Sequence, residues 1–105
     1  MRGAALAMVA LAVAAGGCGE AGPTPGAERG RQVYLAYCTA CHNVDPSKPG
    51  PLGPPVQGSS RALLEAKVLS GTYPSGYTPK RPTTNVMVPM PQLARDLPAL
   101  ADYLR

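Results

Sequence analysis

Five consecutive residues, Cys38-Thr39-Ala40-Cys41-His42, constrain this chain more than any other feature of its sequence. Two residues between the cysteines place both sulfurs where the two vinyl groups of one porphyrin can form thioethers, and the adjacent imidazole can then face the iron. The C-x-x-C-H pattern is the attachment signature of c-type haem. The pattern therefore predicts one covalently bound haem, attached through Cys38 and Cys41, with His42 as an axial ligand of the iron.

Three other uses of this motif fit the rest of the sequence less well. A thioredoxin-like redox pair belongs to a βαβ pattern, and no such pattern surrounds these cysteines. A zinc site would need two further Cys or His ligands, but His42 is the only histidine and Cys18 has another expected role. A structural disulfide between Cys38 and Cys41 would leave His42 unexplained.

The size and composition of the chain also favour a cofactor. The chain has 105 residues, about one domain, with 13 Pro and 12 Gly but neither Phe nor Trp. Removing the 17 residues before Cys18 would leave 88, and so small a chain usually needs a disulfide, metal or cofactor. The net charge of +4 comes without a Lys/Arg-rich run or a helix-turn-helix pattern, so nucleic acid is not an expected partner.

The N-terminus has the features of a signal peptide, which we assign to residues 1–17. It begins with a single basic residue and continues with an apolar stretch over residues 3–15 that is too short to cross a bilayer. The following Ala-Gly-Gly-Cys resembles the lipobox of bacterial lipoproteins, in which the Cys is diacylated. The resemblance implies a lipid anchor on Cys18 and a location on the periplasmic side of a bacterial membrane. An ordinary secretory signal would instead leave Cys18 as a free thiol.

Around the haem motif the chain resembles class I cytochrome c. Three residues before the first Cys match the family's N-terminal helix, and two near the C-terminus match its helix-crossing positions: Gly30, Val33, Tyr34, Leu100 and Tyr103. The resemblance implies a small all-α fold, with three to four helices and long Pro/Gly-rich loops wrapped around one haem. We therefore divide the mature chain into the lipidated Cys with a flexible tether, residues 18–26, and a cytochrome c domain, residues 27–105.

Helix signals within this domain predict two elements after the haem motif. A C-terminal helix is expected over Leu97–Leu104, with Asp96 as its N-cap. A middle helix is expected over Ser60–Ser70, ending at Gly71 as its C-cap. The segments on either side of the middle helix are dense in Pro and Gly and are predicted to be loops, over residues 43–58 and 71–92.

The segment from Gly53 to Gly58 resembles the family's G-P-x-L-x-G sequence, in which the Pro carbonyl accepts a hydrogen bond from the ligating His. The resemblance implies that the backbone of Pro54 orients His42 and makes its imidazole more electron-donating. The overlapping sequence Gly-Pro-Leu-Gly makes Pro51 the alternative acceptor.

The sixth ligand of the iron must be a residue other than histidine, because His42 is the only one in the chain. After removal of the signal peptide only Met87 and Met90 remain as methionines. Pro89-Met90-Pro91 resembles the family's P-M-P ligand loop, which implies Met90 as the second axial ligand, with Met87 as the alternative. His/Met ligation raises the reduction potential and leaves no vacant site on the iron.

The resemblance implies an electron carrier rather than an enzyme, one that passes single electrons between redox protein partners while anchored to a membrane. A fixed haem subunit of a membrane dehydrogenase or quinol-oxidising complex is the alternative. A five-coordinate ligand-binding or peroxidase-like haem protein would require Met90 to be absent from the iron. Two basic residues between prolines, Lys80 and Arg81, are either steering charges for an acidic partner or solvated loop charges.

Overall fold

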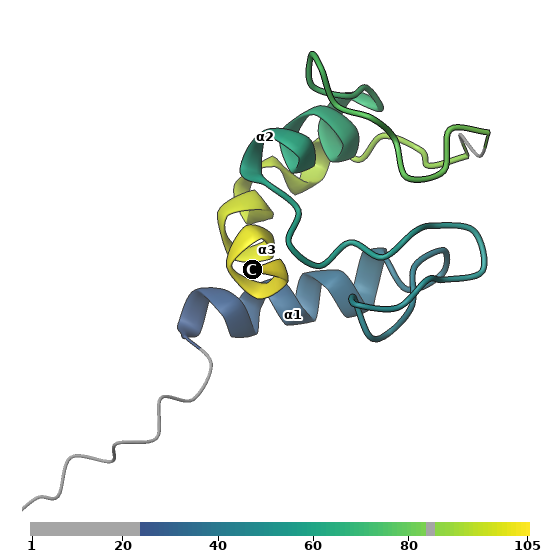
Figure 1. The fold of residues 1–105 in the computed structure, drawn as a ribbon. Helices are drawn as coiled ribbons and strands as arrows, with labels where there is room; N and C mark the ends of the chain where they lie inside the picture. Colours follow the sequence, from purple (N-terminus) through teal and green to yellow (C-terminus); the bar gives the residue numbers. More distant parts are fainter. Residues whose placement is uncertain (1–23, 84–85) are drawn as a thin grey trace, which may run out of the picture.

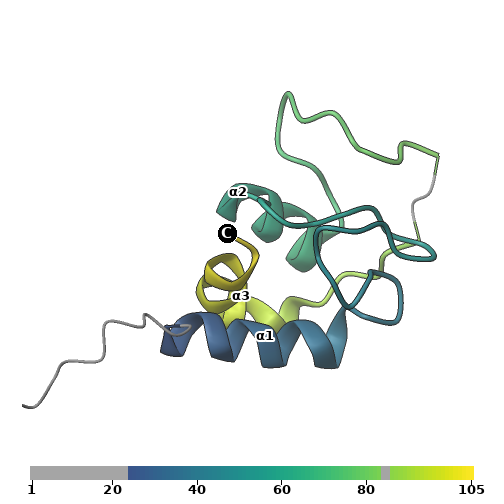
Figure 2. The ribbon, with the colours of Figure 1, turned by 60° about the horizontal axis from the view of Figure 1, so that its bottom comes forward.

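A computed structural model of the chain describes residues 24–83 and 86–105, which form an all-α fold without strands in that part of the chain. Helix α1 spans Pro25–Tyr37, and α2 spans Arg61–Leu64 and continues as a π-helical turn, η1, over Glu65–Leu69. A 3₁₀ helix, η2 (Pro91–Asp96), leads directly into α3 (Leu97–Leu104). The helices gather on one side of the molecule and the long loops on the other (Figures 1 and 2).

Helix α1 begins earlier than the predicted end of the tether. The hydroxyl of Thr24 accepts a hydrogen bond from the Ala27 amide at 3.1 Å, and Pro25 occupies the first helical position, where its missing N–H costs nothing. The tether predicted over residues 18–26 is therefore too long at its C-terminal end. The predicted signal peptide and Cys18 lie outside the described residues.

Helices α1 and α3 cross in close contact, and Gly30 makes the contact possible. A Cβ at this position would overlap the carbonyl oxygen of Ala99 and lie 2.8 Å from the Cβ of Tyr103. Next to the crossing, the rings of Tyr34 and Tyr103 pack with their centroids 5.6 Å apart. The expected helix crossing is thus present, and it fixes the end of α1 that leads into the Cys-x-x-Cys-His motif.

The core is small and almost entirely aliphatic. Its buried side chains come from all of the helices: Val33, Tyr34, Cys38, Leu64, Val68, Leu93, Leu97, Leu100 and Leu104. No polar or charged residue of the described chain is buried among them. Among the helices of residues 24–83 and 86–105, none combines the length and hydropathy that a bilayer span requires.

The C-terminal helix has the predicted bounds, and Asp96 occupies the predicted N-cap position, but its side chain forms no capping hydrogen bond. Asp96 has helical backbone angles and ends η2, so α3 has no free N-terminus for its side chain to cap. The carboxylate instead pairs with Arg29 of α1, with 3.1 Å between Oδ1 and Nε. Because η2 begins at Pro91, the loop that was predicted over residues 71–92 ends at residue 90, two residues before its predicted end.

The middle helix lies within the predicted range, with Ser60 as its N-cap, but its C-cap is Ser70 rather than the predicted Gly71. The hydroxyl of Ser60 accepts the amide of Leu63 at 3.1 Å, and Gly71, directly after the C-cap, has a φ of +69°. Its second half, η1, is a π-helical turn, which the spacing of apolar residues does not indicate. The loops on either side of this helix run out to the same side of the molecule (Figure 2).

Candidate functional site

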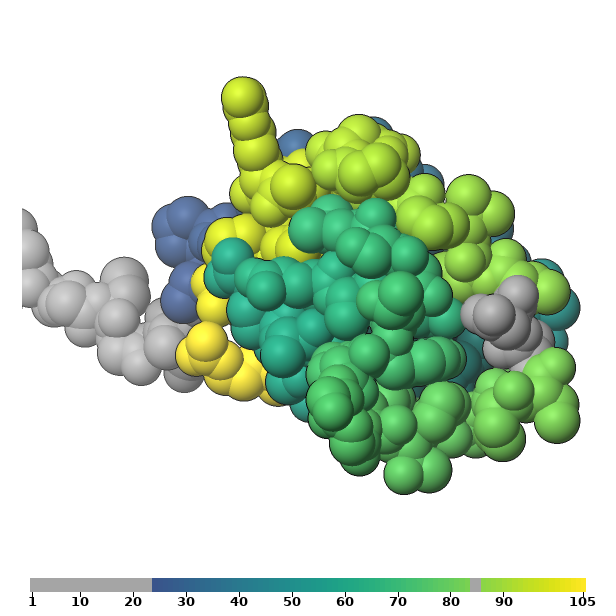
Figure 3. Space-filling model, turned by 90° about the horizontal axis from the view of Figure 1, so that it is seen from above, coloured from purple at the N-terminus to yellow at the C-terminus, as the bar shows by residue number. Residues whose placement is uncertain are grey.

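The loops and the ends of the helices surround a cavity that is open to solvent on one side. Its empty space, including the part that is open to solvent, is about 950 Å³. Residues 71–83, green in the space-filling view, form one margin of the molecule beside α2 and η1 (Figure 3). The haem motif, the segment after it, the middle helix and the loop before η2 all contribute to the lining.

The turn after α1 brings Cys38, Cys41 and His42 to this cavity. The amide of Cys38 donates to the Tyr34 carbonyl at 2.9 Å and so ends α1. The amides of Cys41 and His42 then both donate to the Cys38 carbonyl, at 3.2 and 2.9 Å. This tight turn presents two thiols and an imidazole to the same space.

Both thiols are free, and Cys38 is buried. Burial, with a smaller contribution from the neighbouring Cys41, raises the pKa of Cys38 to about 11. Reactive redox pairs have the opposite property, a lowered thiol pKa. The environment of Cys38 is thus unlike that of a thioredoxin-type pair. Within the described residues, no group of three or more His, Cys, Asp or Glu side chains could hold a zinc ion.

The imidazole of His42 is held by the segment that follows the motif. Its Nδ1 lies 2.9 Å from the carbonyl oxygen of Pro54, which is the acceptor favoured over Pro51 by the sequence pattern. Because a carbonyl can only accept, the hydrogen bond places the proton on Nδ1 and leaves the lone pair on Nε2. An unprotonated ring nitrogen is the form in which histidine binds a metal.

Two glycines allow this segment to lie directly against the motif. The amides of Leu52 and Gly53 both donate to the Cys41 carbonyl, at 3.2 and 2.8 Å. A Cβ at Gly53 would overlap the imidazole of His42, and one at Gly50 would lie 2.6 Å from the Cα of His42. The backbone therefore packs on the ring with no room for a side chain.

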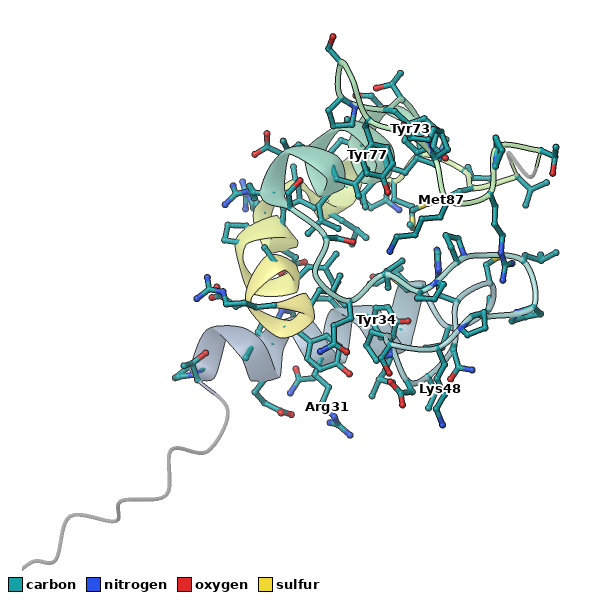
Figure 4. The ribbon with its side chains drawn as sticks, in the orientation of Figure 1. Arg31, Tyr34, Lys48, Tyr73, Tyr77 and Met87 are labelled. Atoms are coloured by element: carbon teal, nitrogen blue, oxygen red, sulfur yellow. The ribbon has the colours of Figure 1, made fainter. Side chains whose placement is uncertain are left out.

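The structure separates the two methionines. Met87 lines the cavity, and in Figure 4 it lies on the same side as Tyr73 and Tyr77, across from Tyr34. Met90 is not among the residues that line the cavity. Its amide donates to the Val68 carbonyl at 2.6 Å, its side chain packs against the core, and it directly precedes η2. The lining of the cavity thus includes Met87, the alternative ligand, and not Met90, the favoured one, and the second ligand of the iron stays a prediction.

The cavity also has a cationic and aromatic side that sequence reasoning did not find as a unit. Tyr73 and Tyr77 stack with centroids 5.5 Å apart, and the Lys67 ammonium lies 4.3 Å from the Tyr73 centroid. Lys80 and Arg81 complete this side, and none of the described residues that line the cavity carries a carboxylate. Two tyrosines four residues apart in a Pro/Gly-rich loop are the only local signal of this arrangement.

This set of residues fits a covalently attached haem. Two free thiols on one turn can form thioethers with the porphyrin, the imidazole beside them is already oriented by Pro54, and Met87 offers a thioether from another wall. The Gly53 backbone lies directly against the His42 ring.

Comparison with known proteins agrees with this site. No curated protein and no solved structure matches the chain. The family model described as Cytochrome c matches residues 27–105, which include the motif, the cavity and all of α3. The chain therefore belongs to the cytochrome c family, as a small class I c-type cytochrome that carries covalently bound haem c and uses it for electron transfer.

Proposed function

We propose that this protein is a membrane-tethered electron carrier that passes single electrons between redox partner proteins through a haem ligated by His42 and Met87. One observation carries the ligand assignment: these two side chains and both cysteines line the same cavity, whereas Met90 does not. The assignment of Met87 replaces Met90, which the proline pattern alone favours.

The residues around the site suit electron transfer better than bond-making chemistry. When bound, haem c supplies a one-electron couple at its iron. The Pro54 carbonyl holds the His42 proton at Nδ1 and increases the electron donation of the ring. A thioether from Met87 raises the reduction potential, and two protein ligands leave no open position for oxygen or peroxide.

The membrane anchor is a proposal that rests on the sequence. Residues 1–17 would be removed, Cys18 would carry the lipid, and the protein would face the periplasm of a bacterium. Because α1 begins at Pro25, the tether between Cys18 and the helix is about six residues, with an r.m.s. reach of about 13 Å. Such a tether keeps the haem domain close to membrane-bound partners and leaves it free to reorient.

Two matched substitutions test the ligand assignment. Met87→Ala should abolish the weak near-red absorption of ferric Met–haem, lower the reduction potential and let added cyanide or imidazole bind, with the haem still attached through Cys38 and Cys41. Met90→Ala should retain the near-red band, because both methionines pack against the core but only Met87 also lines the cavity. Loss of the band in Met90→Ala alone would refute the assignment, and retention in both variants would refute ligation by a single methionine.

A further inference from the structure

We propose that Lys80 and Arg81 are positioning residues that hold the His42–Pro54 hydrogen bond in place. Each donates a side-chain hydrogen bond to the segment that covers the imidazole: Lys80 Nζ to the Pro55 carbonyl at 2.8 Å, and Arg81 to the Gly50 carbonyl at 3.2 Å. This inference rests on the proposed ligation of the iron by His42. It assigns the two cations a role other than steering a partner.

The two hydrogen bonds hold opposite ends of one short segment, residues 50–55. Arg81 contacts its first residue and Lys80 its last, and the carbonyl that accepts from His42 belongs to Pro54, between them. Inside the segment the Gly50 amide donates to the Gly53 carbonyl at 2.9 Å, which closes a turn. A shift at either end would therefore move the Pro54 carbonyl relative to the ring.

The backbone of this segment transmits such a shift because it has little internal freedom. Pro54 and Pro55 both have a fixed φ, and Pro55 also restricts Pro54 to extended conformations. In an extended chain neighbouring carbonyls point in different directions. One carbonyl of this pair accepts from His42 while the next accepts from Lys80.

The cations themselves come from a loop that is stiffened in the same way. Pro79 and Pro82 flank them, so the two side chains start from a restricted backbone. Neither forms an ion pair with a carboxylate among the described residues, and Arg81 is half-buried. A half-buried guanidinium bonded to a backbone carbonyl is not a freely solvated loop charge.

The same contacts join the two sides of the haem site. Met87 follows Arg81 by six residues in the chain, and His42 lies under the segment that Arg81 holds. The two cations thus fasten the loop that leads to one proposed ligand onto the segment that orients the other. These contacts span 25 and 31 residues of sequence.

The test compares two double variants of the haem protein that each remove two positive charges. Lys80→Ala/Arg81→Ala removes both contacts to the segment. The control, Arg31→Ala/Lys48→Ala, removes two exposed cations whose ion pairs in the described part of the chain are with Glu28 and Asp45, and both lie away from Met87 in Figure 4. In the ferrous protein, NMR measures hydrogen exchange at the His42 ring N–H, with the buried Leu100 amide reporting global stability.

In Lys80→Ala/Arg81→Ala we expect exchange at the His42 ring N–H to become about tenfold faster, relative to exchange at the Leu100 amide. This is about the effect of losing one hydrogen bond from a charged donor. The control should match the wild type, and Lys80→Arg/Arg81→Lys, which keeps both cations, should recover most of the protection. Equal exchange in the two double variants, with slower association with redox partners in the first alone, would overturn the proposal in favour of steering charges. Fast exchange of the His42 ring N–H in the wild type would also overturn the proposal. If the spectrum in either case is still low-spin with the near-red band, the proposed function stands although this inference fails.

Discussion

The substitution Gly53→Ala tests how far the His42 geometry depends on the backbone that covers it. Gly53 is buried, and it is not one of the positive-φ glycines of the described chain, which are Gly58, Gly71 and Gly76. Alanine therefore fits the backbone conformation. The only conflict is steric, because the new Cβ would overlap Cε1 and Nδ1 of His42 and lie 2.8 Å from Nε2.

The size of the effect follows from these contacts. Ordinary contacts of a Cβ are 3.4–4 Å, so the ring or the segment must move by about 1 Å. Overpacking of this kind costs about 1–3 kcal/mol, and weakening the hydrogen bond to Pro54 adds about 0.5–1.5 kcal/mol. The lower entropy of the unfolded alanine variant returns about 0.4–1 kcal/mol. We expect a net loss of about 2 kcal/mol in the free energy of unfolding.

Denaturant unfolding of the haem protein, followed by absorption and by the His42 ring resonance, measures this loss. Gly26→Ala is the control, because it makes the same substitution and its Cβ would meet the end of the Asp102 side chain, at 2.7 Å, and otherwise only the Thr24 hydroxyl at an ordinary contact distance. Because that carboxylate can rotate away, the control should keep the stability of the wild type or gain up to about 1 kcal/mol from the lower entropy of its unfolded chain. If Gly53→Ala unfolds at the same denaturant concentration as the wild type, with an unchanged His42 resonance, the packing argument is wrong.

Three other outcomes are expected. Gly30→Ala should lower the free energy of unfolding by about 1–3 kcal/mol, measured by thermal unfolding, because its Cβ would overlap the backbone of α3. Burial raises the pKa of Tyr34 from 10.0 to about 12, so this side chain ionises at a lower pH in the unfolded chain than in the folded protein. Its contribution to the free energy of unfolding is therefore complete below about pH 10 and is lost as the pH rises toward 12. Tyr34→Phe should flatten that decline, by at most about 2.7 kcal/mol, in denaturant unfolding at several alkaline pH values. Cys18→Ser should release the protein from membranes or stall its processing, and wild-type protein recovered only in the soluble periplasmic fraction would contradict the lipid anchor.

Local signals in the sequence predicted the helices and the haem motif well. The bounds of α3 and the cap at Ser60 follow from apolar spacing and capping chemistry within a few residues of each end. The lack of a capping hydrogen bond from the Asp96 side chain has a nonlocal cause. A capping residue acts only at a free helix start, and here η2 precedes α3 while Arg29 of another helix binds the carboxylate.

The contact between His42 and Pro54 could be anticipated because both residues lie within one stretch of 13 residues that carries a recognisable pattern. The contacts of Lys80 and Arg81 could not. Each joins two irregular loops far apart in the chain, and each ends on a backbone carbonyl, which leaves no mark in the identity of the residue that accepts. A pair of basic residues in a loop has the same sequence whether it is solvated or bound.

The proline pattern around the two methionines does not by itself say which of them binds the iron. Prolines on both sides of Met90 restrict its backbone, and that restriction suits a ligand held for a metal as well as a residue held at the start of a helix. The structure uses it for the helix: Pro91 is the first residue of η2, where proline needs no amide partner, and the Met90 amide is bound to Val68. Pro89 lies close to Gly71 at the end of the middle helix, since a Cβ on Gly71 would be 3.0 Å from the Pro89 ring. With Met90 held against the middle helix, the chain before it runs along the cavity, and the sulfur that it brings there is that of Met87.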